Sequence, residues 1–445
     1  MKCLIVGAGA REHAILRQLN HHKQAGDQFF CAPSNAGIEA ESLAQSVSFA
    51  ATDVQELAKW AKDNAIDLTI VGPEVPLALG IVDQFEQLGL CILGPNQNLA
   101  QLESSKVFAK EFMERHHIRT ASYALFKDSD YADARLYIRQ QPHPLVIKAD
   151  GLAAGKGVVV SESIKQSEDT LKDYFHTRTL GDAASQIVIE SFIAGEEASL
   201  IAVVDVSPDH VGYVAFPFCQ DHKRVGEGDM GANTGGMGAY APVPHLSRFY
   251  ETAIKDVIEA SLNALKAEGK TYRGFLFCGL MIDSAGVIHV LEYNVRLGDP
   301  ETCVLLPLVT DVGVNLRDVF WRAAQGKLTE KLCVEPKRFA LGTVLASKGY
   351  PEKAQSLAAF ELKQSQQTDT WWCHAGTSKA EERFSHKGGR VACAVSLADS
   401  LQTAQANSLA LIRQNATDGL IYRADIGFRA IAADKGRKAL NDGLL

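Results

Sequence analysis

The stretch Val287–Glu301, which reads VIHVLEYNVRLGDPE, begins as an apolar strand and ends in a run of charges. Side chains alternate between the two faces of a strand, so Glu292 and Asn294 are expected on the same face, with their Cα atoms about 6.6 Å apart. Two oxygen donors at that spacing suit Mg²⁺, which prefers oxygen ligands and usually keeps phosphate oxygens in its coordination shell. The stretch therefore predicts a metal site at the end of a strand.

Three more charged residues follow these two oxygen donors: Arg296, Asp299 and Glu301. Gly298 and Pro300 are expected to hold them in a turn. Charges this dense at the end of a strand indicate a functional site, with a solvated surface turn as the alternative. A functional site of this kind needs a ligand that carries phosphate.

Bulk properties narrow the class of protein. The chain has 445 residues, of which 46% are hydrophobic and 22% charged, as in a globular protein of about three domains. With a net charge of −8 and no run of lysine or arginine, no nucleic-acid partner is expected, although small anions stay open. No apolar stretch of about 18 residues predicts a membrane span. Nine scattered cysteines without a Cys-x-x-Cys pair, and a Met1–Val6 start that is no signal peptide, indicate a cytoplasmic protein.

The first part of the chain, residues 1–105, alternates short apolar runs with helical patterns. This order predicts a parallel, doubly wound sheet that binds its ligand at the carboxyl ends of the strands. We expect strands at 3–6, 68–71 and 90–93, and helices at 11–20, 53–64 and 77–88.

A glycine turn, Gly7–His13, follows the first predicted strand. It is a poor dinucleotide fingerprint, because Glu12 stands where the third glycine belongs. Gly9 at a helix N-terminus followed by Arg11 instead predicts a phosphate site, and a sugar phosphate fits it better than NAD. A plain tight turn between strand and helix is the alternative. Glu74 follows the pair Gly72-Pro73 and is a candidate acceptor of hydrogen bonds from ribose hydroxyls.

A second glycine loop, Gly151–Gly157, follows a predicted strand that ends at Lys148. It is not a P-loop, because Gly151 and Gly155 are separated by three residues and a β-branched strand follows instead of a helix. We expect a hairpin whose loop closes over a triphosphate while Lys148 and Lys156 neutralise charge. A hairpin without a ligand is the alternative.

Two further segments have the composition of binding elements. Gln186–Glu197 runs from an apolar strand into acidic residues, which suits contacts with an adenine edge and ribose hydroxyls; an edge strand ending in a turn is the alternative. Gly226–Gly238 contains six glycines and predicts a loop that holds a carboxylate or a phosphoryl group, with disorder as the alternative. Phe275–Asp283 and Val287–Asn294 are expected to form a hairpin, and 307–325 a helix. After about residue 335 the pattern indicates a small α+β domain.

Together, Lys106, Lys148, the glycine hairpin, the acidic segment and Glu292 with Asn294 and Arg296 resemble the ATP-grasp superfamily. More narrowly, the chain resembles the glycinamide ribonucleotide synthetase (phosphoribosylamine–glycine ligase) family. The resemblance runs in order through Gly7–His13, Val71–Glu74, Lys148–Lys156, Asp221–Arg224, Asn233–Tyr240, Gly298–Glu301 and His374–Thr377. Ala10, Ser34, Leu291 and Leu297 depart from the residues usual in that family, but none of these changes removes a charged group.

The resemblance implies an α/β and α+β multidomain protein: an N-terminal domain at 1–105 that binds phosphoribosylamine, an ATP-grasp domain at 106–330 with its lid at about 122–195, and a C-terminal α+β domain at 331–445. It implies ATP-dependent joining of glycine to 5-phosphoribosylamine through a glycyl phosphate, the second step of de novo purine synthesis. The implied cofactors are ATP and Mg²⁺ or Mn²⁺. A monomer is expected, with a dimer as the alternative.

The resemblance also implies site roles. Catalytic roles fall to Lys148, Asp221 and Arg296, and metal binding to Glu292 and Asn294. The implied ATP contacts are Lys106, Lys148, Gly151, Gly155, Lys156, Gly157, Glu190, Phe192 and Glu197. The implied substrate contacts are Gly9, Arg11, Glu12, Asn35, Pro73, Glu74, Thr234, Gly235, Gly236, Met237 and Arg296.

Three other functions stay open on the sequence. A related ATP-grasp ligase or carboxylase of purine synthesis would use another carboxylate, but Asp221–Arg224 with Asn233–Tyr240 favours glycine. An NAD-dependent oxidoreductase would rest on Gly7–Glu12 alone. A non-catalytic nucleotide sensor would lack the metal pair and the lysines that this chain has.

Overall fold

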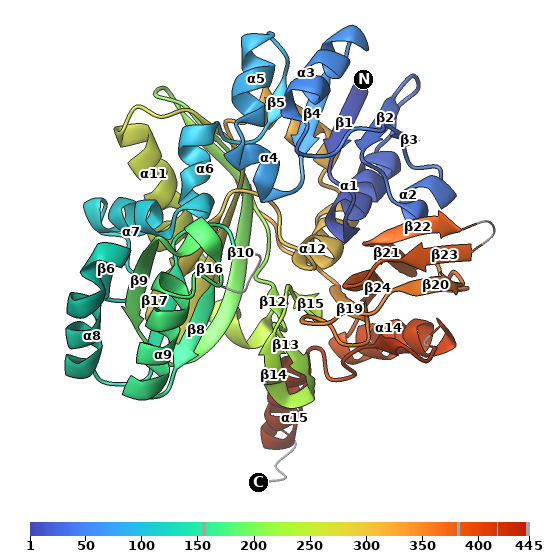
Figure 1. Ribbon diagram of the computed structural model, residues 1–445. Coiled ribbons are helices and arrows are strands. Elements are labelled where there is room, and N and C mark those ends of the chain that lie inside the picture. The colour runs from blue at the N-terminus through green and yellow to red at the C-terminus, as the bar shows by residue number, and fades with distance from the viewer. Residues whose placement is uncertain (154–156, 381–382, 416, 442–445) are drawn as a thin grey trace.

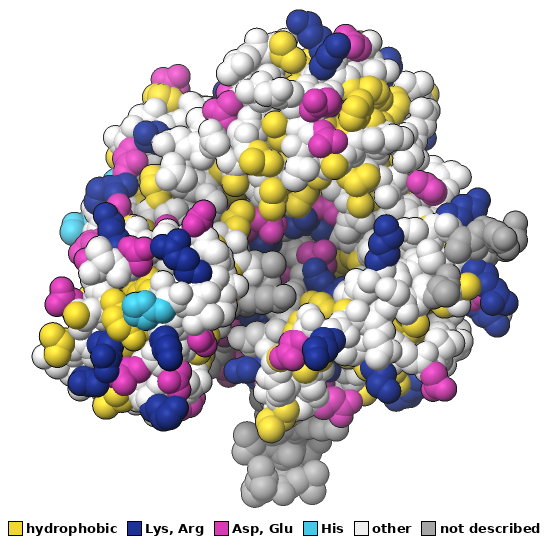
Figure 2. Space-filling model, viewed as in Figure 1, with side chains coloured by type: hydrophobic (Ala, Val, Ile, Leu, Met, Phe, Trp, Pro, Cys, Tyr) yellow, Lys and Arg dark blue, Asp and Glu magenta, His cyan; other side chains and the backbone are white. Residues whose placement is uncertain are grey.

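The computed structural model describes residues 1–153, 157–380, 383–415 and 417–441. An N-terminal part, a central part and a C-terminal part are arranged around the middle of the molecule (Figure 1). Figure 2 shows that the surface is hollowed there and that charged side chains of both signs line the floor of the hollow. The predicted class, α/β and α+β parts with a parallel sheet at the N-terminus, is confirmed.

The N-terminal sheet has the strand order β3-β2-β1-β4-β5, and every pairing in it is parallel. Its strands are β1 (Lys2–Val6), β2 (Gln28–Ala32), β3 (Gln45–Ser46), β4 (Leu68–Val71) and β5 (Ile92–Leu93), and its helices are α1 (Ala10–His21), α2 (Ala36–Ala40), α3 (Val54–Asp63), α4 (Glu74–Ala78), α5 (Ile81–Gln87) and α6 (Gln97–Ser104). The single helix expected at 77–88 is wrong: Gly80, at φ 81°, separates α4 from α5.

The central part contains two sheets. A small antiparallel sheet has the order β6-β9-β7-β8, with β6 (Tyr123–Lys127), β7 (Leu145–Ala149), β8 (Val158–Ser161) and β9 (Gln186–Ser191) next to helices α8 (Tyr131–Gln140) and α9 (Ile164–Phe175). The hairpin expected around the 151–157 loop is confirmed, since β7 pairs antiparallel with β8. A larger sheet has the order β17-β16-β10-β11-β18.

The larger sheet consists of β10 (Gly195–Val206), β11 (Val211–Ala215), β16 (Tyr272–Asp283), β17 (Ile288–Asn294) and β18 (Lys331–Cys333). The expected hairpin that ends in Glu292 and Asn294 is confirmed as β16–β17. Helices α7 (Lys106–Arg115), α10 (Tyr250–Ala253), α11 (Ala260–Ala267) and α13 (Leu316–Ala324) lie around it. Helix α12 (Glu301–Asp311) packs instead mainly against α1 and the sheet of the C-terminal part. The one helix expected at 307–325 is therefore two helices, divided near Gly313, whose φ is 85°.

The glycine-rich segment expected to be a loop is a β-hairpin. Its strands are β12 (Gln220–Asp221), β13 (Arg224–Gly226), β14 (Met230–Asn233) and β15 (Gly238–Ala241). β12 pairs with β15, and β13 with β14. The two glycine-bearing turns hid the strand alternation in the sequence, because glycine contributes no side chain to either face.

The hairpin also joins the sheet of the C-terminal part, whose order is β12-β15-β19-β24-β21 with β25 beside β19. That part contains β19 (Phe339–Ser347), β20 (Leu357–Phe360), β21 (Thr370–His374), β22 (Thr377–Ala380), β23 (Arg383–His386), β24 (Arg390–Ala398), α14 (Leu401–Asn415), β25 (Leu420–Ile421) and α15 (Phe428–Asn441). All nine cysteines are free. In the part of the chain that the structure describes, no helix is long and apolar enough to cross a membrane.

Candidate active site

The two predicted metal ligands lie at the end of β17. Glu292 pairs with Gly279 of β16, whereas Leu280 pairs with Val290, so the register shifts just before Glu292. No described residue forms a hydrogen bond or ion pair with the Glu292 carboxylate. Asn294 is nearly buried, and its Oδ1 accepts a 3.1 Å hydrogen bond from Arg296.

Four cations act on Glu292. Burial favours the neutral carboxyl, yet the pKa of Glu292 is lowered, because nearby positive charges outweigh burial; these are Lys223, Lys148, Lys106 and Arg296. Burial lowers the pKa of Lys106, although Glu292 opposes that shift. A carboxylate that stays ionised and has unpaired oxygens is suited to a divalent cation.

The donor set fits a metal ion that shares its shell with phosphate. The described ranges contain no group of three or more histidine, cysteine or acidic side chains that could hold a metal by themselves. Glu292 and Asn294 would thus supply two oxygen ligands, and phosphate and water the rest. Mg²⁺ is commonly bound in this way, by one or two carboxylates plus substrate phosphates.

Lys148 also lies near Glu292. Its Nζ donates a 3.1 Å hydrogen bond to the Leu291 carbonyl oxygen and lies 2.9 Å from Glu190 Oε1. Lys110 Nζ lies 3.1 Å from the same Glu190 oxygen, and burial lowers the pKa of Lys110 to about 8. The predicted ATP contact Glu190 is thus buried between two lysines. Sequence reasoning missed Lys110, although its place one turn after Lys106 on α7 puts both on one helix face.

The 150–157 loop starts next to α7. Asp150 Oδ1 accepts hydrogen bonds from Ser105 Oγ (3.0 Å) and the Val107 amide (2.8 Å). The predicted ATP contacts Gly151 and Gly157 flank the loop, and a Cβ at either one would lie 2.9 Å from a neighbouring alanine atom. Gly155 and Lys156 fall outside the described residues.

The acidic start of β10, just after the segment that joins β9 to β10, faces the hairpin of residues 220–241. Phe192 is exposed in that joining segment, and Glu197 Oε2 lies 3.0 Å from Lys223 Nζ. The Glu197 carboxylate raises the pKa of Lys223. Lys223 was not among the predicted site residues, although it stands inside the Asp221–Arg224 motif.

The N-terminal glycine turn is braced from inside by Glu12. Its Oε2 accepts a 2.5 Å hydrogen bond from the Gly9 amide, and its Oε1 a 2.6 Å bond from Arg11 Nε. Any side chain at Gly72 would collide with Glu12, because a Cβ there would lie 1.8 Å from Oε1. The Glu12 carboxylate is therefore committed to the turn, while Arg11 also donates to the Leu297 carbonyl oxygen (3.1 Å).

Asn35 connects the N-terminal part with the C-terminal part. Its Nδ2 donates to the carbonyl oxygens of Ala8 (2.8 Å) and His374 (3.0 Å), and its Oδ1 caps α2. The predicted substrate contact is thus buried, and its side chain holds the backbone of the phosphate loop against β21. Gly37 leaves room for the His374 ring, which a Cβ at that position would meet at 2.2 Å.

Arg296 lies among carboxylates. Its Nη2 is 2.8 Å from Glu103 Oε1, and its Nε is 3.4 Å from Glu74 Oε2. These carboxylates outweigh burial and raise the pKa of Arg296. The predicted substrate contacts Pro73 and Glu74 lie near Arg296, because α4 begins at Glu74. Glu103, on α6, was missed, since no motif singles it out.

The residues at 234–237, which were predicted to contact substrate, interact with different parts of the molecule. The Thr234 amide and Oγ1 both donate to the Lys223 carbonyl oxygen, at 2.7 and 2.9 Å. Gly236, at φ 113°, packs against the charged turn, where a Cβ would lie 2.5 Å from Pro300 Cδ. Met237 is fully buried, so its side chain does not reach the hollow.

Two residues of the C-terminal part bind Gly235, and sequence reasoning missed both. The Gly235 amide donates to Tyr350 Oη (3.0 Å), and Arg390 Nη1 donates to the Gly235 carbonyl oxygen (2.8 Å). Arg390 Nη1 also donates to the Asp299 carbonyl oxygen (2.7 Å). Arg390 therefore ties the hairpin to the charged turn. Gly388 and Gly389 mark a turn before it, but no pattern places it in the site.

The carboxyl groups of Asp221, which is half-buried, and Glu301, which is buried, interact with each other. Burial and the Glu301 charge raise the pKa of Asp221, despite Lys223 and Arg390 nearby. Burial also raises the pKa of Glu301, whose Oε1 accepts a hydrogen bond from Ser199 Oγ (3.3 Å). Each carboxylate therefore binds a proton more readily than an exposed carboxylate does, as is common for proton-transfer residues.

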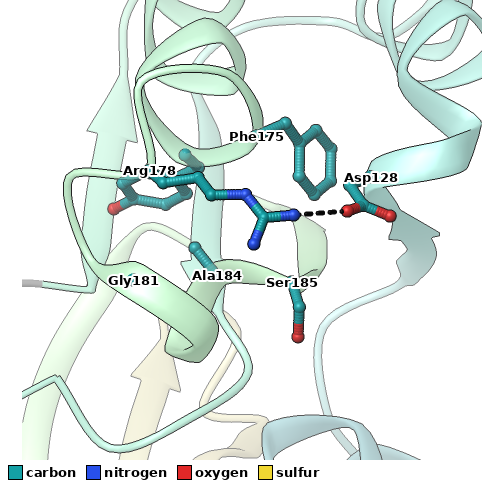
Figure 3. A pocket seen from close by; sticks show the side chains of 7 residues that line it. Asp128, Phe175, Arg178, Gly181, Ala184 and Ser185 are labelled. Atoms are coloured by element: carbon teal, nitrogen blue, oxygen red, sulfur yellow. Dashed lines mark hydrogen bonds and ion pairs between the residues drawn. The ribbon is translucent and has the colours of Figure 1, made fainter.

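A separate hollow lies beside the small sheet of the central part, between the end of α9, residues 178–185 and Asp128, and none of the predicted site residues lines it. Figure 3 shows Arg178 reaching across it to Asp128, and the two side chains form a 3.0 Å ion pair. Phe175 and Ala184 contribute apolar walls. The charged residues of the candidate active site lie instead around Glu292.

Models of three domains of one family match the chain: Phosphoribosylglycinamide synthetase, N domain, at residues 1–103; ATP-grasp (A) domain, at 104–302; and C domain, at 340–429. The phosphoribosylamine–glycine ligase of Vibrio cholerae is 42% identical over 443 residues, covering 98% of this chain and 100% of the relative. That of Salmonella typhi is 43% identical over 438 residues, with the same coverages.

Comparison with solved structures supports the same family and fold. The phosphoribosylamine–glycine ligase of Thermotoga maritima superposes with a TM-score of 0.81 at 30% identity, covering 96% of this chain and 100% of that one. The biotin carboxylase domain of Hydrogenobacter thermophilus 2-oxoglutarate carboxylase, in complex with MgADP, has a TM-score of 0.69 at 14% identity and covers 95% and 91%, which shows a shared fold. The chain therefore belongs to the phosphoribosylglycinamide synthetase family.

Proposed function

We propose that the chain is a phosphoribosylamine–glycine ligase, which uses ATP to join glycine to 5-phosphoribosylamine and releases glycinamide ribonucleotide, ADP and phosphate in the second step of de novo purine synthesis. The observation that carries this proposal is the Glu292 carboxylate, unpaired and surrounded by Lys106, Lys148 and Lys223. Full-length similarity to ligases of that name supports it.

In the proposed reaction, a glycine carboxylate oxygen attacks the γ-phosphorus of ATP and ADP leaves. The amine of phosphoribosylamine then attacks the carbonyl carbon of the glycyl phosphate, and phosphate leaves as the amine loses a proton. A carboxylate and a triphosphate repel each other, so the first step needs positive charge at the phosphates. Lys106 and Lys148 supply it, and Glu292 and Asn294 would hold Mg²⁺ or Mn²⁺, which would add positive charge at the phosphates. The domain of similar fold that was solved with MgADP supports this choice.

The acceptor side is proposed to lie between Arg296 and residues 233–238, which include the connection from β14 to β15. Arg296 is a half-buried cation two residues from Asn294 and would hold the glycine carboxylate. Asp221, with its raised pKa, is the proposed acceptor for the amine proton. Gly9 and Arg11 would hold the sugar phosphate, with Glu74 toward the ribose. ATP would lie against Glu190, Phe192 and Glu197, under the 151–157 loop.

Release of ADP tests the proposal most directly. The purified protein is assayed with ATP, Mg²⁺, glycine and freshly generated phosphoribosylamine, and each substrate is omitted in turn. We expect ADP release to require glycine and to match glycinamide ribonucleotide one to one when all substrates are present. Release that is indifferent to glycine would refute the ligase assignment. Repeating the assay with Mn²⁺ and Ca²⁺ identifies the metal.

Two finer expectations stay predictions. The chain is proposed to act as a monomer, which sedimentation velocity with and without ATP would test. The cytoplasm is the proposed compartment, in agreement with the nine free cysteines.

A further inference from the structure

The hairpin of residues 220–241 ends in a tight tip. Gly228 and Asp229 lie there in left-handed backbone conformations, with φ of 65° and 58°. Glycine adopts this conformation freely and aspartate tolerates it, but such a turn does not fix where the hairpin points. Other contacts must therefore set the position of the two strands relative to the hollow.

The segment Arg423–Gly427, just before α15, supplies contacts at the tip. Arg423 Nη1 donates to Asp229 Oδ1 (2.9 Å) and to the Arg224 carbonyl oxygen (3.0 Å), and its side chain is fully buried. Asp425 accepts 2.8 Å hydrogen bonds from both Nε and Nη2 of Arg423. Asp425 Oδ2 also accepts the Gly228 amide at 2.8 Å. The guanidinium is thus held in one orientation, and the tip with it.

The same segment binds the hairpin further along. The Gly427 amide donates to His222 Nε2 (3.1 Å), while His222 Nδ1 lies 3.3 Å from the Gly238 carbonyl oxygen. His222 is therefore neutral, with its proton on Nδ1, and burial lowers its pKa to about 4. His222 thus contacts this segment, whereas its neighbours Asp221 and Lys223 interact with other parts of the molecule.

Those neighbours of His222 belong to the proposed active site. Lys223 reaches Glu197 at 3.0 Å and acts on the charge of Glu292, and Asp221 lies beside Glu301. The Arg423–Gly427 segment is not one of the proposed substrate contacts. Its influence on the chemistry must pass through the hairpin.

We infer that Arg423 and Asp425 are positioning residues of the ligation reaction, which lock the hairpin so that Lys223 and Asp221 are held against the glycyl phosphate. The inference rests on the proposed function. A shift of about 1 Å in a reacting group can cost ~10²-fold in rate, so a loosened hairpin slows ligation even in a folded protein. It also admits water, so glycyl phosphate hydrolyses and ADP release exceeds product formation.

Arg423→Met, Arg423→Lys and Asp425→Asn test this inference against Arg338→Met. Arg338 is a matched control, because it also pairs with several carboxylates (Asp311 at the end of α12, and Asp369 and Asp399 of the C-terminal part), and none of these ion pairs involves the hairpin. For each variant, Tm, kcat, the KM values for ATP and glycine, and the ratio of ADP to glycinamide ribonucleotide are measured.

We expect Arg423→Met to lower kcat by ~10- to ~100-fold and to raise the ADP-to-product ratio above one, with the KM for ATP within about twofold of wild type. Arg423→Lys keeps the charge but not the fork of donors, so it should recover part of kcat. Should Arg423→Met fail to fold, the milder Asp425→Asn decides the question by the same ratio. Kinetics equal to those of Arg338→Met at an equal loss of Tm would overturn the inference.

Hydrogen exchange gives a readout that does not depend on turnover. Amides of residues 224–233 should exchange faster in Asp425→Asn than in wild type, while those of β16 and β17 stay unchanged. Unchanged exchange at 224–233 would count against the inference. A wild-type protein that releases ADP without glycine would instead refute the proposed function, and the exchange result would stand apart from it.

Discussion

The guanidinium of Arg11 donates a 3.1 Å hydrogen bond to the backbone oxygen of Leu297, which lies 286 residues further along the chain. Leu297 follows Arg296 and precedes the turn whose Asp299 side chain lies close to Gly9. The proposed sugar-phosphate loop and the proposed acceptor cation are thus joined through one backbone group. Binding of the second substrate and the position of Arg296 should therefore be coupled.

Arg11→Ala tests the sugar-phosphate site. We expect a raised KM for phosphoribosylamine, by ~10-fold or more, because a charged hydrogen bond is worth about 1.5–3 kcal/mol. The KM for ATP should change little. Arg17→Ala is the control: Arg17 lies on the same helix but pairs with Glu41. An unchanged KM for phosphoribosylamine would move the phosphate site elsewhere.

Glu292→Gln tests the metal site. The amide keeps the shape but removes the charge, so kcat should fall by well over ~10²-fold, the scale for losing one partner of transition-state charge. The Mg²⁺ concentration needed for half-maximal rate should rise. Asp283→Asn, at the other end of the same hairpin, is the matched control and should leave both values near wild type. Near-normal turnover of Glu292→Gln would rule out the metal assignment.

Lys148→Ala tests the triphosphate site. Lys148 is held by Glu190 and by the Leu291 carbonyl oxygen, so it is poised before ATP arrives. Its loss should raise the KM for ATP more than the KM for glycine, as steady-state kinetics with each substrate varied would show. Lys165→Ala, an exposed lysine of the same part, should change neither. Equal effects on the two KM values would contradict the assignment.

How much of the site the sequence could predict depends on distance along the chain. Glu292 and Asn294 follow from strand alternation, and the β7–β8 hairpin from a local pattern, so both were accessible. Lys110 beside Glu190 and Arg390 beside Gly235 come from separate segments, and only tertiary packing brings them together. The sequence predicts a loop at 226–238, where the structure has part of the 220–241 hairpin, because the strands there are short and rich in glycine.

Acidification should destabilise the contact between the N-terminal and C-terminal parts through His374. Burial, together with His13, lowers the pKa of His374 to about 3. The folded protein therefore keeps His374 neutral, whereas the unfolded chain binds a proton as the pH falls through about 6.5. Unfolding takes up that proton, so stability is full above pH 6.5 and falls progressively toward pH 3.

Between pH 7 and pH 5, this one group should remove about 2 kcal/mol from the free energy of unfolding. Urea unfolding at pH 7, 6 and 5 measures the loss. His374→Asn retains a polar group able to reach Thr377 Oγ1, to which His374 Nδ1 lies at 3.1 Å, but it does not titrate. The variant should be less stable at pH 7, because a smaller side chain leaves space beside Gly37, yet it should lose less stability on acidification. If the free energy of unfolding depends on pH equally in variant and wild type, protonation of His374 is not the cause of the loss of stability in acid.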